Sequence, residues 1–191
     1  RRTKEQHLGV LGAGSIGSSL ILKAKALGFR VSFFDPFKES GFEKALGVNR
    51  YYELDEIVKN SDILSINIPL NPDTEGLVDE NFISKMKEGS TLINTSRGKI
   101  LKNLDLLYEP LISGKLKNVG LDVLPEEPPQ SGLLIDAWRN NDKKIINKVI
   151  INPHVSYFSQ EAYKEMRQSA ARNALNMINN HTPRNIILDS R

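Results

Sequence analysis

Three residues that could act in chemistry, Arg97, Glu127 and His154, each follow a separate apolar segment of the chain. An arginine guanidinium binds a carboxylate through two parallel hydrogen bonds. A histidine exchanges a proton near neutral pH, and a nearby carboxylate orients its ring and stabilises its protonated form. Together they supply what the reduction of a 2-keto acid requires: a cation for the substrate carboxylate and a proton donor for its carbonyl oxygen.

Each of these residues also has an ordinary structural interpretation. Arg97 could cap a helix or bind a surface carboxylate, and His154 could be a hydrogen-bonded loop histidine. Glu127, taken alone, is best interpreted as a solvated loop acid, because most glutamates are exposed. The catalytic interpretation therefore depends on the three residues meeting at one place in the fold.

A glycine-rich stretch near the start of the chain could bind a cofactor. Residues 12–17 read GAGSIG and fit the pattern G-x-G-x-x-G, directly after an apolar run and before a helical pattern. For a dinucleotide, Gly12 allows the tight turn, Gly14 lets the backbone approach the pyrophosphate, and Gly17 lets the helix pack closely on the strand. The N-terminus of that helix offers free N–H groups to the phosphates. The alternative is a glycine-rich turn in another α/β protein; a Walker-type P-loop is excluded because no Gly-Lys-Ser/Thr follows.

Asp35 bears on the choice of cofactor. It ends the second predicted strand, 18 residues after Gly17, close to the spacing of the acid that binds the adenosine ribose. A carboxylate at that position repels a 2′-phosphate. The sequence therefore favours NAD and disfavours NADP.

The elements that must position these residues alternate along the chain. Strands are predicted at 8–11, 30–34, 50–52, 62–68, 91–94, 119–123 and 148–151. Helical patterns lie at 16–27, 42–46, 54–59, 81–87, 102–113, 131–140 and 159–180, and 183–188 is predicted as an extended tail. Alternating strands and helices indicate an α/β fold with a doubly wound parallel sheet. In such a sheet the ligand binds at the carboxyl ends of the strands, where the candidate residues lie.

Composition excludes several classes of function. The chain has 191 residues, 39% of them hydrophobic and 26% charged, which is typical of a globular protein. It has no cysteine and three histidines, so disulfides and thiol catalysis are excluded and no metal site is expected. The net charge of +3 is spread along the chain, which gives nucleic-acid binding little support. No apolar run reaches membrane-spanning length and no signal-peptide pattern opens the chain, so we expect no membrane partner and a cytoplasmic location.

These motifs, taken in order, resemble the NAD-binding domain of the D-isomer-specific 2-hydroxyacid dehydrogenases. Within that family the chain is most similar to the branch that contains the C-terminal binding protein corepressors and their bacterial relatives. The resemblance runs from about Leu8 to about Asn185. Its motifs are GAGSIG (12–17), FDP (34–36), SDILSINIPLNPDTEGLV (61–78), INTSRG (93–98), GLDVLPEEP (120–128) and NPH (152–154).

The resemblance implies a role for each matching residue. Arg97 would hold the substrate carboxylate, and His154, paired with Glu127, would be the acid/base; Glu126 is adjacent, but the motif favours Glu127. For the cofactor it implies Ser15 and Ile16 beside the glycines at the pyrophosphate, Asp35 at the ribose, Ile68, Pro69, Leu70 and Thr74 on the adenosine side, and Thr95, Ser96 and Asp122 near the nicotinamide.

The resemblance also implies a longer protein. Family members have a second, substrate-binding domain, built from an N-terminal segment and the returning C-terminus, that is largely missing here. We therefore expect residues 1–191 to form a single NAD-binding domain, with 181–191 a tail that would return to that domain. By itself this chain should be nearly inactive. The family also implies a homodimer formed through the cofactor domain.

Three functions remain open from the sequence. The first is the cofactor domain of an NAD-dependent 2-hydroxyacid dehydrogenase (EC 1.1.1 type), acting on a small 2-hydroxy or 2-keto acid. The second is an NAD-sensing, protein-binding scaffold that resembles the corepressors, which keep the same three residues. The third is a truncated fragment that binds NAD without turnover. Of these we favour the enzyme.

Overall fold

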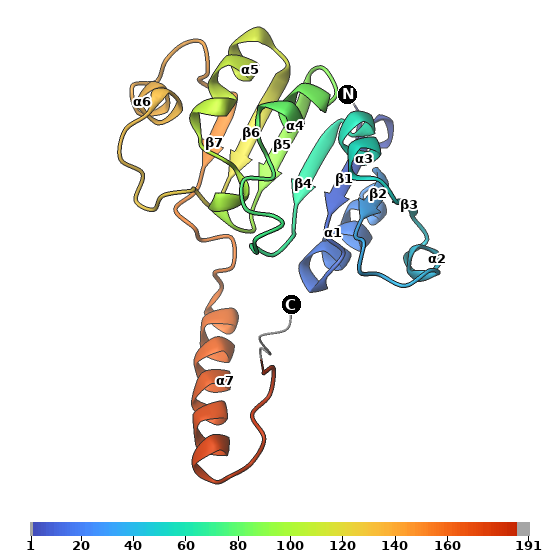
Figure 1. Ribbon diagram of the computed structural model, residues 1–191, viewed down its shortest axis with the longest axis vertical. Coiled ribbons are helices and arrows are strands. Elements are labelled where there is room, and N and C mark those ends of the chain that lie inside the picture. The colour runs from blue at the N-terminus through green and yellow to red at the C-terminus, as the bar shows by residue number, and fades with distance from the viewer. Residues whose placement is uncertain (1, 187–191) are drawn as a thin grey trace. The chain divides into compact units, whose positions relative to one another are not determined.

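The structure of the chain is a computed structural model, which describes residues 2–186 (Figure 1). The chain divides into two compact units, the first ending at His154 and the second beginning at Val155. The expectation that residues 1–191 form a single domain stays a prediction.

The first unit is built on a seven-stranded sheet in which every neighbouring pair of strands is parallel. The strands are β1 (His7–Leu11), β2 (Arg30–Phe34), β3 (Asn49–Tyr51), β4 (Ile63–Ile66), β5 (Ser90–Asn94), β6 (Leu116–Leu121) and β7 (Val149–Ile151). Their order in the sheet is β3-β2-β1-β4-β5-β6-β7. The order reverses between β1 and β4, which is the switch point where doubly wound sheets bind ligands. The predicted fold class is confirmed.

Helices connect these strands. They are α1 (Ser15–Ala26), α2 (Phe42–Leu46), α3 (Leu54–Asn60), α4 (Glu80–Lys85), α5 (Tyr108–Ser113) and α6 (Leu133–Arg139), with 3₁₀ turns at Thr3–Glu5, Gly98–Ile100 and Asp105–Leu107. Within residues 2–186, no helix combines the length and the apolar composition that crossing a lipid bilayer requires.

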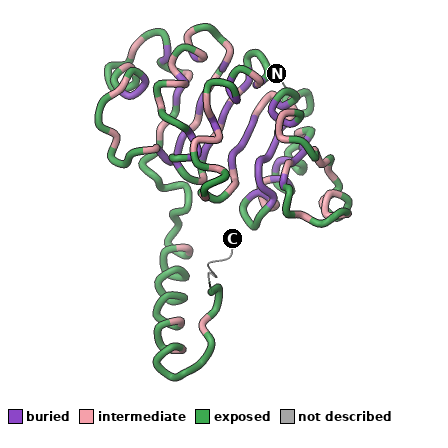
Figure 2. Tube along the Cα trace, in the orientation of Figure 1, coloured by how far each residue is buried: buried purple, intermediate pink, exposed green. Residues whose placement is uncertain are grey.

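Two hydrophobic clusters show that both faces of the sheet are covered. In the smaller cluster, Val10 and Phe33 of β1 and β2 pack with Ile21 of α1. In the larger one, Leu64 and Leu92 of β4 and β5 join buried residues of α3, α4, α5 and α6. Figure 2 shows that the buried residues concentrate along the strands. The sheet is therefore a rigid platform that fixes the positions of its strand ends.

The predicted helix at 102–113 is wrong in its first half. The chain forms a separate 3₁₀ turn at Asp105–Leu107 and only then the short helix α5. Pro110 explains the difference, since it lies in the first turn of α5, where a helix needs no backbone N–H from it. Late in a helix that began at residue 102, the same proline would break a hydrogen bond.

The second unit contains one long helix, α7 (Gln160–Ile178). It begins where predicted, with the Ser159 hydroxyl accepting a hydrogen bond from the Ala162 N–H at 3.0 Å. After the helix, Arg184 and Asn173 exchange two hydrogen bonds of 3.0 Å each, so the chain turns back alongside α7. Residues 187 and 188 of the predicted extended tail at 183–188 lie outside the described residues. The same is true of residues 187–191 of the tail that is expected to return to a substrate domain.

Candidate functional site

The turn between β1 and α1 has the geometry expected of a pyrophosphate-binding loop. Gly12 has φ +87°, and a Cβ there would lie 2.7 Å from the backbone oxygen of Asn67. Gly17 is closer still, because its Cβ would lie 1.9 Å from the Gly12 oxygen. A Cβ on Gly14, in contrast, would meet no atom within 4 Å. Gly12 and Gly17 are thus required by packing, whereas Gly14 leaves the loop open to a ligand.

Residues after the glycines keep the mouth of the loop accessible. Ser15 is the first residue of α1, and Ile16 is 71% exposed. Ser18 donates its hydroxyl hydrogen bond to the Ala13 oxygen at 2.9 Å, which ties the first turn of α1 to the loop. The first N–H groups of the helix therefore remain directed to the carboxyl edge of the sheet.

Asp35 points toward the glycine turn. Its carboxylate accepts hydrogen bonds from the N–H of Ala13 at 2.8 Å and of Phe37 at 3.0 Å, and the residue is buried. Beside it is a pocket of about 370 Å³. Six predicted cofactor residues line this pocket: Gly12, Gly14, Asp35, Ile68, Pro69 and Thr74. A buried carboxylate at a mostly apolar pocket fits the adenosine half of a dinucleotide.

The segment after β4 forms one wall of this pocket. The Thr74 hydroxyl donates to the Pro69 carbonyl at 2.7 Å, and the Asn71 carboxamide oxygen accepts from the Thr74 N–H at 3.0 Å. These bonds close a compact turn that holds Ile68 and Pro69 at the strand end. Leu70, predicted on the adenosine side, lines a different pocket, the one with Arg97 and His154. Its adenosine role stays a prediction.

The turn that carries Thr95, Ser96 and Arg97 is organised by Asn94, the last residue of β5. The Asn94 side chain is fully buried; its oxygen accepts from the Ser96 N–H at 3.1 Å and its amide donates to the Arg97 carbonyl at 3.0 Å. Sequence reasoning did not single out Asn94. The signal that could have found it is an asparagine at a strand end before a polar turn, where its side chain mimics backbone.

Gly98 holds the same turn against the loop after β6. A Cβ on Gly98 would lie 1.9 Å from the Leu124 oxygen and 2.5 Å from the Pro125 nitrogen. These are backbone atoms, so only glycine allows the approach. The Arg97 turn and the loop that leads to Glu127 are therefore packed directly together.

Glu127 and His154 form a pair across that loop. Glu127 Oε2 lies 2.9 Å from His154 Nδ1, and Oε1 accepts from the Leu124 N–H at 2.8 Å. Partial burial raises the pKa of Glu127, but the Leu124 hydrogen bond and the His154 contact outweigh it and hold the pKa below its ordinary value. Glu127 is therefore a carboxylate at neutral pH and can orient the imidazole.

The backbone of His154 is also held in place. His154 has φ +53°, a left-handed conformation that a residue other than glycine adopts at a cost of about 1–3 kcal/mol. Its N–H donates to the carbonyl of Asp122 at 2.9 Å, so the strained residue is tied to the end of β6. Asp122, which the resemblance predicts near the nicotinamide, is itself buried.

All three predicted catalytic residues line one pocket. Arg97, Glu127 and His154 surround a hollow of about 210 Å³, together with Leu70 and Lys99. The Arg97 guanidinium donates to the Ser96 carbonyl at 2.8 Å, which holds the side chain close to its own turn. Lys99 was not predicted; it adds a second cation, and its place two residues after Arg97 is the only sequence signal for it. The pocket thus combines positive charge with an imidazole–carboxylate pair, as an anionic carbonyl compound requires.

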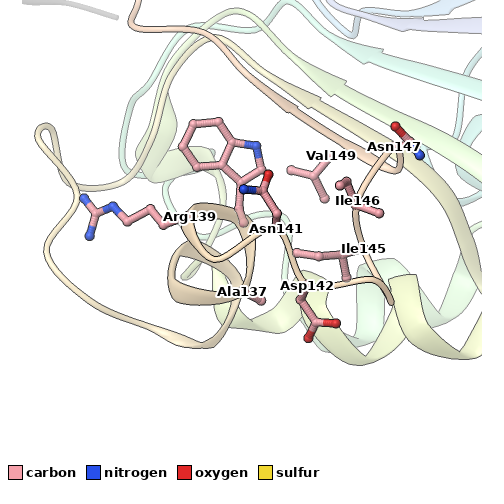
Figure 3. Close-up of a pocket in the computed structure, with 9 residues that line it drawn as sticks. Ala137, Arg139, Asn141, Asp142, Ile145, Ile146, Asn147 and Val149 are labelled. Atoms are coloured by element: carbon pink, nitrogen blue, oxygen red, sulfur yellow. The ribbon is translucent and has the colours of Figure 1, made fainter.

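Another pocket, of about 350 Å³, lies at the far end of α6 (Figure 3). It is lined by Ala137, Asn141, Asp142, Ile145 and Val149, among others. None of the predicted site residues lines it. In the described part of the chain, no group of three or more histidine, aspartate or glutamate side chains could hold a metal ion.

Comparison with known proteins agrees with this geometry. Residues 1–156 match the family model described as "D-isomer specific 2-hydroxyacid dehydrogenase, NAD binding domain". The chain belongs to this family. The coarser part of the resemblance is confirmed, whereas similarity to the corepressor branch stays a prediction.

Three relatives illustrate the match. The chain is 35% identical over 168 residues to a hydroxypyruvate reductase of Blautia hydrogenotrophica, covering 88% of the chain and 49% of the relative. It is 33% identical over 182 residues to a glyoxylate reductase of Korarchaeum cryptofilum, covering 94% and 51%. The structure of Aquifex aeolicus D-lactate dehydrogenase complexed with NAD and lactic acid matches with a TM-score of 0.79 and 31% identity, over 94% of this chain and 55% of that one. The chain therefore spans about half the length of the curated relatives it matches.

Proposed function

We propose that this chain is the cofactor-binding half of an enzyme that transfers hydride between NAD(H) and a small 2-hydroxy or 2-keto acid. The observation that carries the proposal is the pocket shared by Arg97, Glu127 and His154, with Glu127 bonded to the imidazole. These residues come from loops after three different strands, and they meet at the edge where the cofactor pocket opens.

Each residue has one task in this proposal. Arg97 binds the substrate carboxylate through its planar guanidinium, and this contact fixes which face of the carbonyl is presented. Glu127 keeps the imidazole oriented and stabilises its cationic form. Because Nδ1 faces Glu127, Nε2 is the ring nitrogen assigned to proton exchange with the substrate oxygen. The glycine turn and Asp35 would hold NAD, which would supply the hydride chemistry.

Asp35 supports NAD over NADP as the cofactor. Its carboxylate is buried and accepts two backbone hydrogen bonds, so a 2′-phosphate beside it would face a like negative charge at short range. The 191-residue chain should bind NADH at least about tenfold more tightly than NADPH, a difference of about 1.4 kcal/mol. Fluorescence titration with both cofactors measures the ratio. Asp35→Ser should reduce it, and an unchanged ratio would contradict this role.

The proposed activity belongs to the protein expressed from its complete reading frame. The test is oxidation of NADH with hydroxypyruvate, glyoxylate and pyruvate, the first two chosen because relatives are named for them. Arg97→Gln should raise KM for the keto acid, whereas His154→Gln should lower kcat by about 10²–10⁴-fold. Arg30→Gln is the matched control, because Arg30 begins β2 and so lies at the amino end of its strand, opposite the edge that carries the candidate residues. Full activity in His154→Gln would refute the assignment.

The 191-residue chain alone should turn over little substrate, and rapid NADH oxidation by it would overturn that prediction. The homodimer implied by the resemblance and the cytoplasmic location expected from the sequence pattern stay predictions. Size-exclusion chromatography with light scattering tests the first of these.

A further inference from the structure

Arg139, the last residue of α6, makes two hydrogen bonds to a loop that lies beside the candidate site. One guanidinium nitrogen donates to the Gln130 carbonyl at 2.6 Å, and the other donates to the Pro129 carbonyl at 2.8 Å. The two acceptors are consecutive backbone oxygens, and they match the two parallel donors of a planar guanidinium. Arg139 therefore fixes the path of the backbone two to three residues after Glu127.

The helix that carries Arg139 is itself firmly held. Leu134 and Ile135 are buried in the larger hydrophobic cluster, and the Asp105 carboxylate accepts from the Leu134 N–H at 3.1 Å. Figure 3 shows the Arg139 side chain extending from the end of α6, away from Ile145 and Val149. The guanidinium is thus anchored at one end to the core of the unit and reaches the loop at its other end.

The loop held by Arg139 carries one of the proposed site residues. The Glu127 carboxylate contacts His154 at 2.9 Å and accepts from the Leu124 N–H at 2.8 Å. Both contacts require the Glu127 backbone to stay in its present position. Arg139, Pro129, Glu127 and His154 also line one hollow of about 500 Å³, so the end of α6 and the Glu127–His154 pair border the same space. Most of this loop is exposed, so little hydrophobic packing holds it in place.

We propose that Arg139 is a positioning residue that acts through Glu127: by clamping the carbonyls of Pro129 and Gln130, it keeps the Glu127 carboxylate on the His154 imidazole. This inference rests on the proposed function for its catalytic consequence, but the clamp itself can be tested without turnover. Misplacement of a catalytic group by about 1 Å lowers a rate by up to about 10²-fold. A residue outside the reaction pocket can therefore control the rate through geometry alone.

The first experiment measures the pair directly in the 191-residue chain. The Glu127 side-chain carboxyl is titrated by ¹³C NMR, with Glu127→Gln used to assign its signal. In the unsubstituted chain the pKa of Glu127 should lie below its ordinary value, and in Arg139→Gln it should rise toward that value as the carboxylate loses its two hydrogen bonds. Arg139→Lys should lie between, because an ammonium cannot hold both carbonyls in fixed geometry.

Lys143→Gln is the matched control, since it removes one positive charge from the connection that follows Arg139, between α6 and β7. It should leave the Glu127 titration unchanged. Thermal melts establish that every variant is folded at the temperature of the titration. A titration of Glu127 that is the same in Arg139→Gln as in the unsubstituted chain would overturn the proposal.

The second experiment uses the protein expressed from its complete reading frame. Arg139→Gln should lower kcat by about tenfold while the affinity for NADH stays the same, because the cofactor pocket is formed by other residues. In a Glu127→Gln background the same substitution should have almost no further effect. An equal loss in both backgrounds would overturn the proposal. If Glu127→Gln itself leaves kcat unchanged, the role proposed for Glu127 fails, and the NMR titration still decides whether Arg139 is a clamp.

Discussion

Two glycines of the same turn should respond in opposite ways to substitution by alanine. At Gly17 a Cβ would lie 1.9 Å from the Gly12 oxygen and 2.9 Å from the Gly12 carbonyl carbon. Both neighbours are backbone atoms, so the turn or α1 must move by about 1.5 Å or more to reach ordinary contact. At Gly14 no atom lies within 4 Å of the added carbon. Packing alone therefore forbids one substitution and permits the other.

The magnitude for Gly17→Ala follows from two opposed effects. Overpacking against backbone costs about 1–3 kcal/mol or more. Alanine inside a helix recovers up to about 1 kcal/mol relative to glycine. The net loss should be about 2 kcal/mol, which corresponds to a fall in Tm of about 4–8 °C for a domain of this size. Gly14→Ala, at the N-cap of α1, should change Tm by less than about 2 °C.

The assay pairs thermal unfolding with NADH titration. Gly14→Ala should weaken NADH binding while stability is kept, because its methyl group occupies space that the pyrophosphate is proposed to fill. Gly17→Ala should lose stability even without cofactor. If Gly17→Ala melts at the same temperature as the unsubstituted chain, or if Gly14→Ala binds NADH unchanged, the reasoning on this turn is refuted.

Three further predictions concern single side chains. Because the pKa of Glu127 is lowered in the folded chain, the pair with His154 stabilises the fold above the ordinary pKa of about 4.5, and this stabilisation is lost as the pH falls through the lowered value. Glu127→Gln should therefore reduce the loss of stability at acid pH, measured by urea unfolding as a function of pH. An unchanged loss would contradict the prediction. Asn94→Ala removes the buried carboxamide that bonds to both the Ser96 N–H and the Arg97 carbonyl. It should lower the free energy of unfolding by about 2–3 kcal/mol in chemical denaturation. A loss below about 0.5 kcal/mol would show that water replaces the carboxamide. The Asp79 carboxylate caps α4 by accepting from the Phe82 N–H at 2.8 Å. In the same denaturation assay, Asp79→Ala should lower the free energy of unfolding by about 1 kcal/mol, and Asp79→Asn should lower it less. Equal losses in the two variants would show that the charge of Asp79 matters, not its capping bond.

The fold could be predicted from sequence because its determinants are local. Alternating apolar strands and helical patterns, several of them ended by glycine or proline, define the elements by backbone conformation and periodicity within a few residues. The glycine turn and Asp35 belong to one strand–helix–strand unit, so their spacing fixes their meeting. Prediction was less successful at 102–113, where tertiary packing placed Pro110 in the first turn of a shorter helix.

The site needed more than local pattern. Sequence order puts Arg97, Glu127 and His154 after successive strands, and parallel strands bring their carboxyl ends to one edge. Which loop atoms then touch depends on how each loop folds back. The choice between Glu126 and Glu127 had only a motif to support it, whereas the 2.9 Å contact to His154 is made by Glu127.

Sequence by itself determined the class of the sheet, the position of the glycine turn and the edge at which a ligand binds. Only the tertiary structure revealed the Asn94 bonds under the Arg97 turn, the place of Leu70 beside Arg97, and the reach of Arg139 to the loop after Glu127. The physical reason is the range of the interactions. Backbone conformation and periodicity act within a few residues, whereas these contacts depend on the paths of loops whose ends are fixed by strands far apart in the chain.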